Sequence, residues 1–120
     1  MSLVERVKAR LFPVDRTNTV LTNGHATNAD RTHAKIDDQS GLQRAYIVLT
    51  EAERARGFVR PVRHSYRHLM CHGVTTMNSA IAETYARDPT FYHATFCATC
   101  RRHFSLAAFV WTDDGSPVGS

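Results

Sequence analysis

The sequence predicts a small α+β fold, in which a small antiparallel sheet carries a pair of zinc-ribbon-like knuckles and one inserted helix. Three observations support this prediction. Two short turns rich in Cys and His stand 25 residues apart, short apolar segments typical of strands surround them, and the clearest helical pattern lies between them. A short helix and an extended arm are expected to precede this fold.

The composition of the 120-residue chain changes near residue 44, and we place a boundary there. Residues 1–44 are expected to form a short N-terminal helix, opened by a capping box of Ser2 and Glu5 and ended by Pro13, and then a polar extended arm. Residues 14–44 contain only five large apolar side chains. The arm is therefore expected to be disordered alone and to become ordered against a partner, with packing on its own domain as the alternative.

Residues 45–120 are expected to form a zinc-stabilised α+β domain. Thr50 and Glu53 make a second capping box that opens a short helix, and the main helix is expected over 78–87, where Asp88-Pro89 stops it. Pro61 indicates an edge position for the strand that contains it. The predicted strands are the apolar or alternating segments 45–49, 58–63, 65–69, 91–96 and 104–111.

The strongest chemical signal is the pair His68-x-x-Cys71 and Cys97-x-x-Cys100. One nitrogen and three thiolates match a closed, tetrahedral zinc site of the Cys3His type. The gap between the pairs exceeds the usual zinc-ribbon spacing, and the inserted helix accounts for the excess. Gly73 is expected to give the first turn its backbone freedom.

Several alternatives to this site stay open in the sequence. His72 and His103 stand beside the same cysteines, and either could replace His68 as the fourth ligand. A redox CxxC would need a helix after the second pair, where a strand is predicted, and an iron-sulfur cluster usually takes four thiolates. The cysteines could also be small buried core residues. A catalytic zinc would need an open coordination position and a nearby base, and neither turn contains Asp or Glu.

The chain is basic, with a formal net charge of +4, and its cations are 13 Arg and only 2 Lys. The densest stretch is 54–68, which holds five Arg and no acid. Such a face could bind phosphates, or it could pair with acids of the arm or of a protein partner. The candidate nucleic-acid or partner-binding residues are Arg60, Arg63, Arg67, Arg101 and Arg102.

The sequence also predicts where the protein works. Its longest uninterrupted apolar stretch has six residues, against about 20 for a membrane span, and no signal-peptide pattern opens the chain. We therefore expect no membrane association and a location in the cytoplasm of a bacterial host or in a virion. Three cysteines cannot all pair in one chain, so metal ligation is favoured over a disulfide framework.

Five segments of the second part of the chain form a distinctive pattern: Gly57–Arg63, Cys71–Met77, Ala82–Pro89, Phe96–Cys100 and Val118–Ser120. With this pattern, residues 45–120 resemble a group of small, mostly uncharacterised zinc-knuckle proteins encoded by tailed bacteriophages and prophages. In that group a second glycine commonly follows the first cysteine, where this chain has His72. The resemblance implies a phage or prophage setting and a zinc knuckle, but no particular reaction.

The combined observations predict a non-enzymatic, zinc-stabilised protein-interaction module that serves as a structural or accessory component of a phage particle or another phage-encoded assembly. Zinc is the expected cofactor, and the expected partners are proteins. No small-molecule substrate is expected, because the sequence has no phosphate loop and no recognisable catalytic motif. The alternative function is a nucleic-acid-binding regulator, or an inhibitor of a host system, that acts through the Arg-rich face.

Overall fold

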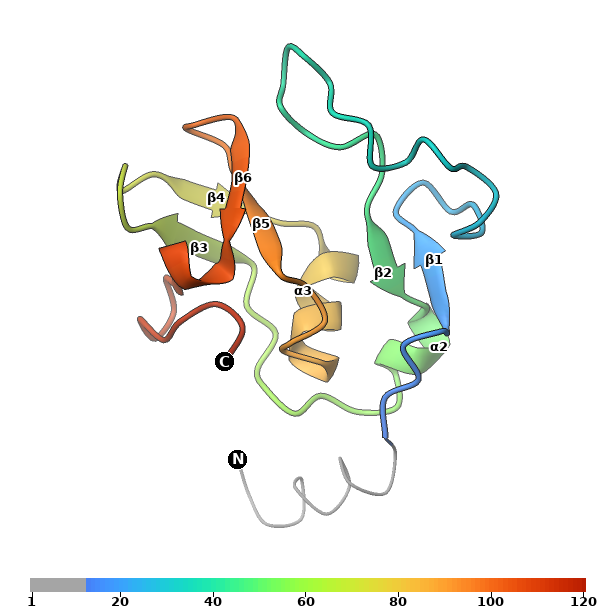
Figure 1. Ribbon diagram of the computed structural model, residues 1–120. Helices are drawn as coiled ribbons and strands as arrows, with labels where there is room; N and C mark the ends of the chain where they lie inside the picture. Colours follow the sequence, from blue (N-terminus) through green and yellow to red (C-terminus); the bar gives the residue numbers. More distant parts are fainter. Residues whose placement is uncertain (1–12) are drawn as a thin grey trace.

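A computed structural model of the protein describes residues 13–120. The short helix predicted before Pro13 lies outside the described residues. Figure 1 shows α3 in the middle of the molecule, with β1, β2 and α2 on one side and the remaining strands on the other. The elements are β1 (Thr19–Leu21), β2 (Ile47–Leu49), α2 (Glu51–Arg54), β3 (Ser65–His68), β4 (Val74–Thr76), α3 (Ser79–Arg87), β5 (Ala94–Cys97), β6 (Arg102–Ser105), a 3-10 turn (Leu106–Ala108) and β7 (Phe109–Trp111).

The strands form three small antiparallel sheets, ordered β1-β2, β4-β3-β7 and β5-β6. The predicted α+β class with small antiparallel sheets and one helix between the two ligand pairs is confirmed. In the central sheet Tyr66 pairs with Thr75 on one side and Trp111 on the other, and all three side chains are buried. This sheet therefore turns one face toward the core, and β3 carries His68 at its end.

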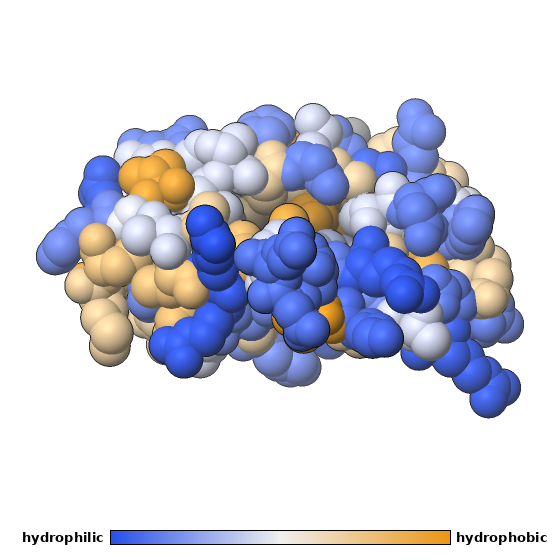
Figure 2. All heavy atoms as spheres, turned by 90° about the horizontal axis from the view of Figure 1, so that it is seen from above, coloured by the Kyte–Doolittle hydropathy of each residue, from blue (hydrophilic) through white to orange (hydrophobic). Residues whose placement is uncertain are grey.

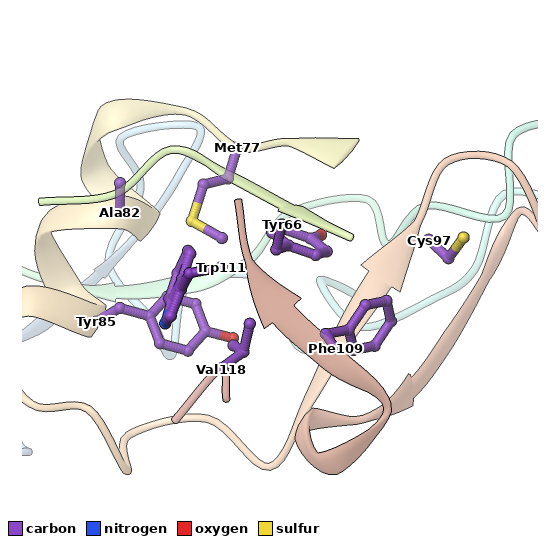
Figure 3. Packing of buried hydrophobic residues seen from close by; sticks show 8 residues of the cluster. All are labelled: Tyr66, Met77, Ala82, Tyr85, Cys97, Phe109, Trp111 and Val118. Atoms are coloured by element: carbon purple, nitrogen blue, oxygen red, sulfur yellow. The ribbon is translucent and has the colours of Figure 1, made fainter. Parts of the chain in front are cut away.

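Aromatic side chains fill the core between this sheet and α3 (Figure 3). Tyr85 of α3 meets Trp111 edge to face, with ring centroids 5.4 Å apart. The Tyr66 hydroxyl donates to the carbonyl of Phe96 and accepts from Thr95, and burial raises the pKa of Tyr66 to about 12. Cys97 belongs to the same buried cluster, so one candidate ligand is fixed directly by the core.

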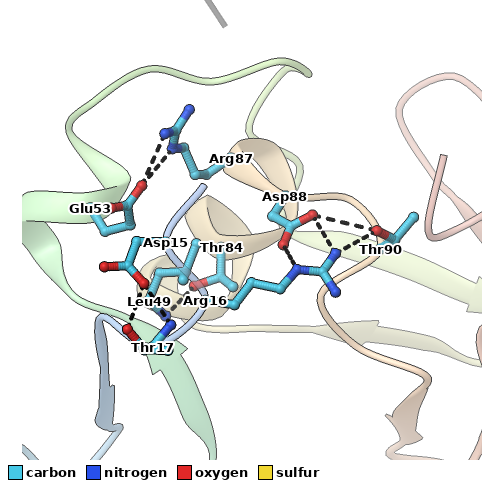
Figure 4. A network of polar contacts seen from close by, with 9 residues as sticks. All are labelled: Asp15, Arg16, Thr17, Leu49, Glu53, Thr84, Arg87, Asp88 and Thr90. Atoms are coloured by element: carbon cyan, nitrogen blue, oxygen red, sulfur yellow. Dashed lines mark hydrogen bonds and ion pairs between the residues drawn. The ribbon is translucent and has the colours of Figure 1, made fainter. Parts of the chain in front are cut away.

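The arm packs on its own domain, and the expectation that it needs a partner to become ordered is wrong for residues 16–21. Thr19–Leu21 pairs with Ile47–Leu49, and Leu21 is only 1% exposed. Arg16 donates two hydrogen bonds to Asp88 at the end of α3 (Figure 4). A few hydrogen bonds between β1 and β2 and one buried side chain are enough to order this part of the arm, because β2 is itself held against α3. There the Leu49 amide donates to Thr84.

The helices predicted after Thr50 and over 78–87 are confirmed, and of the predicted capping box the Thr50 half is present. Thr50 accepts a hydrogen bond from the Glu53 amide at the start of α2, and Asn78 accepts one from the Ile81 amide at the start of α3. Glu53 is also buried and pairs with Arg87 of α3, which links the two helices (Figure 4).

Two of the strand predictions need correction, and one further strand was not predicted. Residues 58–63 form no strand. This segment instead lies against the end of α3, where the amides of Val59 and Arg60 both donate to the carbonyl of Ala86. The expected strand 104–111 is divided by the 3-10 turn, so its two parts join different sheets. The strand Val74–Thr76 was not predicted, because three polar-flanked residues carry too little periodicity to be recognised.

Candidate metal centre

The four predicted ligands come from the turns of two β-hairpins. His68 ends β3 and Cys71 lies in the turn before β4, while Cys97 ends β5 and Cys100 lies in the turn before β6. Each hairpin therefore presents one donor at the end of a strand and a second donor three residues later. The short turn brings both donors to the same side of its hairpin.

The two turns share one backbone construction. The residue after each second ligand, His72 or Arg101, donates its amide to the carbonyl of the first ligand, at 2.8 and 2.7 Å. Their φ angles are 63° and 58°, and they are the two non-glycine residues with positive φ in the part of the chain that the structure describes. The left-handed residue is what turns the chain back into the second strand of each hairpin.

Gly73 has a different role from the one predicted for it. The left-handed position in the first turn is His72, and Gly73 is not among the positive-φ glycines. A Cβ on Gly73 would lie 2.1 Å from Thr99 Oγ1 and 3.3 Å from Cys71 Sγ. Glycine is therefore required at position 73 for the space between the two hairpins.

The ligand atoms of His68, Cys71, Cys97 and Cys100 all lie within 4.8 Å of one another. His68 Nδ1 is 3.3 Å from Cys71 Sγ and 3.7 Å from Cys100 Sγ, and the sulfurs of Cys71 and Cys97 are 3.6 Å apart. Tetrahedral zinc, with bonds of about 2.3 Å to sulfur and 2.0 Å to nitrogen, separates two sulfurs by about 3.8 Å and a sulfur from a nitrogen by about 3.5 Å. The donor set and its spacing therefore fit a closed four-coordinate metal site.

The imidazole of His68 is held in place by aromatic rings. Its centroid lies 4.4 Å from that of Phe104 and 4.9 Å from that of Phe109, and the residue is only 1% exposed. These rings fix the plane of the imidazole so that Nδ1 points at the sulfurs. Neither phenylalanine stands out in the sequence as part of the site, because both lie more than 30 residues beyond His68.

The hydrogen bonds around the sulfurs differ from one thiol to another. The Gly73 amide donates to Cys71 Sγ, and this bond is the main reason that the pKa of Cys71 is lowered to about 7. Burial, followed by the neighbouring thiols, raises the pKa of Cys100 to about 11. The lowered pKa favours the thiolate form of Cys71. Ionisation of all three cysteines, in contrast, needs a cation between the sulfurs to offset the repulsion among the thiolates.

Two further contacts join the hairpins and the arm around the site. The Ala98 amide donates to Thr75 Oγ1, which links the second turn to β4. In the arm, Gly41 has φ 81°, and a Cβ there would be 1.9 Å from the carbonyl oxygen of Arg101. No local signal in the sequence marks either contact, because each joins residues that are more than 20 positions apart.

The other two candidate histidines lie elsewhere. His72 is exposed and does not belong to the cluster. His103 Nε2 lies 2.7 Å from the Tyr46 hydroxyl, and burial lowers the pKa of this imidazole. The structure thus groups His68 with the three cysteines, a choice that the sequence left open.

The five candidate arginines do not form one free face. Arg63 is only 5% exposed, and it donates to Asp114, Ser116 and the Ser120 carbonyl and stacks on Trp111 at 4.6 Å. Its expected binding role is therefore replaced by a structural one, in which it holds the last residues against the core. The four arginines that remain exposed are Arg60, Arg67, Arg101 and Arg102.

No protein-family model matches this chain, and no curated protein or solved structure matches it. Within residues 13–120, no helix has the length and apolar character needed to cross a membrane.

Proposed function

We propose that this protein is a non-enzymatic protein-interaction module that zinc stabilises. The observation that carries the proposal is the convergence of His68, Cys71, Cys97 and Cys100 on one point. Three sulfurs and one imidazole nitrogen at tetrahedral spacing favour zinc over hard cations such as magnesium or calcium, which take oxygen ligands.

A structural role for zinc is supported by the closed ligand set. Four protein donors complete a tetrahedron and leave no position for water or substrate. The residues around the site also supply no carboxylate, because 54–82 and 89–112 contain neither Asp nor Glu. Metal binding would then contribute directly to the free energy of folding, since each hairpin alone is too short to be stable.

An interaction role is supported by what surrounds the site. The first turn exposes Leu69 and Met70, which are 53% and 81% accessible, beside the exposed Arg67. Met and Arg are both enriched at protein interfaces. The assembly that we propose is a phage particle or another phage-encoded complex, and this part of the proposal depends on the resemblance of residues 45–120 to phage-encoded proteins.

The test is to measure the metal content of the purified protein and of ligand variants by elemental analysis. We expect one zinc per chain, lost together with the folded state in Cys97→Ser and Cys100→Ser. Ala98→Ser, which adds a hydroxyl to an exposed position of the same turn, is the matched control and should retain zinc. Wild-type protein that folds without any bound metal would overturn the proposal.

The alternative function, nucleic-acid binding, has less support. Arg63 is occupied within the fold, and the aromatic rings of Tyr66, Phe109 and Trp111 are buried and so are not offered for stacking on bases. Affinity for a labelled DNA duplex at about 50 mM salt that fell steeply as the salt rose would favour this alternative over the first proposal.

A further inference from the structure

The outer side of the first hairpin is a small apolar surface around one arginine. We call Arg67, Leu69, Met70 and Val74 the first-hairpin face. Arg67 and Val74 are register partners on β3 and β4, and both point away from the core because their neighbours Tyr66, His68 and Thr75 point into it. The turn residues Leu69 and Met70 extend the same exposed surface.

This face has no negative charge to balance it. The side chain of Arg67 makes no hydrogen bond or ion pair with any other residue of 13–120. Segments 54–82 and 89–112, which form both hairpins, contain no acid, so the acids of the chain lie elsewhere. A surface of aliphatic side chains around a free guanidinium is complementary to a segment that combines aliphatic side chains with carboxylates.

The chain itself carries such a segment in the loop 36–42. Ile36 and Leu42 are 45% and 41% exposed, and Asp37 and Asp38 between them are exposed as well. Figure 2 looks down on this end of the molecule and shows small hydrophobic patches among mostly hydrophilic side chains.

The loop is held in one conformation before any contact is made. The Asp37 amide donates to the Leu42 carbonyl, the Gly41 amide donates to the Asp37 carbonyl, and the Asp37 carboxylate accepts from Ser40. Gly41 also rests against the backbone of Arg101 in the second hairpin. A preorganised loop loses little conformational entropy on binding.

The loop and the first-hairpin face of one chain do not meet. Gly41 seats the loop on the second hairpin, and Figure 1 shows β5 and β6 between the loop and the turn that joins β3 to β4. Both complementary surfaces therefore stay exposed on every copy of the chain.

We propose that the loop 36–42 of one copy docks on the first-hairpin face of a second copy, with Asp38 beside Arg67 and Ile36 or Leu42 against Met70. This inference rests on the proposed function and names a partner for it. The loop and the first-hairpin face are different surfaces, so a single contact between two copies is heterologous. In a two-fold dimer the contact would instead occur twice, with the loop of each copy on the first-hairpin face of the other. Repetition of such a contact is how an assembly component builds a ring, a filament or a closed dimer.

The test is sedimentation velocity of the zinc-loaded protein over a range of concentrations, with charge reversal at each side of the contact. Asp38 suits this purpose because its side chain makes no hydrogen bond or ion pair within 13–120. We expect Arg67→Glu and Asp38→Arg each to weaken self-association by about tenfold or more, and the double variant to restore it toward wild type. Lys35 and Arg44 also border the loop, so they would contribute to any salt dependence of self-association. Rescue by the double variant is therefore a more specific test of the contact between Asp38 and Arg67 than salt dependence is.

Two matched controls make the same charge changes elsewhere. Arg60→Glu and Asp113→Arg alter exposed residues outside both surfaces and should leave self-association unchanged. Met70→Ser should weaken it without a change of charge. A protein that stays monomeric at all concentrations, or an oligomer in which the double variant gives no rescue, would overturn this inference. Neither result bears on the metal content, so the proposed function would stand or fall separately.

Discussion

The backbone of Gly73 lies directly against the side chain of Thr99, and at this point the two ligand-bearing hairpins touch. A Cβ added to Gly73 would be 2.1 Å from Thr99 Oγ1 and 2.8 Å from Thr99 Cβ. Real atoms do not approach so closely, so any side chain at position 73 must push the hairpins apart. The spacing of the four metal ligands therefore depends on a residue that donates nothing to the metal.

We predict that Gly73→Ala weakens zinc binding while all four ligands stay in the chain. Overpacking of a closed contact costs about 1–3 kcal/mol, and here the displaced element carries Cys97 and Cys100. Competition with a chromophoric chelator measures the zinc affinity. Thr99→Gly in the same chain removes both clashing atoms and should return most of the lost affinity. If Gly73→Ala binds zinc as tightly as wild type, the hairpins do not meet at this contact.

We predict that glycine is tolerated, and even stabilising, at the left-handed positions of both turns. A non-glycine residue with positive φ costs roughly 1–2 kcal/mol, which outweighs the extra chain entropy of glycine in the unfolded state. His72→Gly and Arg101→Gly should therefore raise the free energy of unfolding by up to about 1 kcal/mol, measured by denaturant titration of zinc-loaded protein.

The same variants also identify the fourth ligand. His72→Gly should keep zinc, and His68→Ala should lose it, because only His68 Nδ1 reaches the sulfurs. His64→Gly is the control for the stability prediction at His72 and Arg101. This exposed histidine does not have a left-handed backbone conformation, so its replacement by glycine should not raise the free energy of unfolding. Loss of zinc from His72→Gly would show that His72 is a ligand.

The buried pair of Glu53 and Arg87 predicts acid sensitivity. Burial alone would raise the pKa of Glu53, but the hydrogen bonds and charge of Arg87 lower it below 4.5. A lowered pKa means that the fold favours the carboxylate, so this stabilisation is present above pH 4.5 and is lost as the pH falls through the pKa of the folded state.

Glu53→Gln should therefore cost about 3–5 kcal/mol at neutral pH, because it removes the buried carboxylate that accepts two hydrogen bonds from the guanidinium of Arg87. The difference from wild type should shrink as the pH falls through the pKa of the folded state, measured over the pH range in which both proteins keep their zinc and stay folded. Unfolding by denaturant at several pH values measures it. Glu51→Gln, an exposed position of the same helix, is the control and should change stability by less than about 0.5 kcal/mol. A constant difference across this pH range would contradict the prediction.

The packing of the arm predicts that Leu21 contributes to the stability of the whole domain. Leu21→Ala removes a side chain that is 1% exposed and should cost about 2–5 kcal/mol of unfolding free energy. Val20→Ala, at a half-exposed position of the same strand, should cost about 1 kcal/mol or less. Amide exchange provides a second measurement, in which Leu21 should exchange more slowly than Asn23. Equal, small effects of both substitutions would mean that the arm is not part of the fold.

The sequence alone determined the features that depend on near neighbours. The helix over 78–87 and the N-cap role of Thr50 were predicted correctly as local patterns, and the two x-x spaced pairs lie on the hairpin turns that the spacing indicated. Each of them is set by contacts within about four residues, where spacing along the chain fixes spacing in the structure. The α+β class follows from the order of these patterns.

Only the tertiary structure decided the features that depend on distant residues. His68 joins the cysteines because Phe104 and Phe109 hold its ring, whereas His103 is turned toward Tyr46. Arg63 is bound within the fold because the chain returns fifty residues later to meet it. The physical reason is that the burial of a side chain and its contacts depend on residues that are distant in the sequence and are brought together by folding. The sequence pattern shows only which side chains are present.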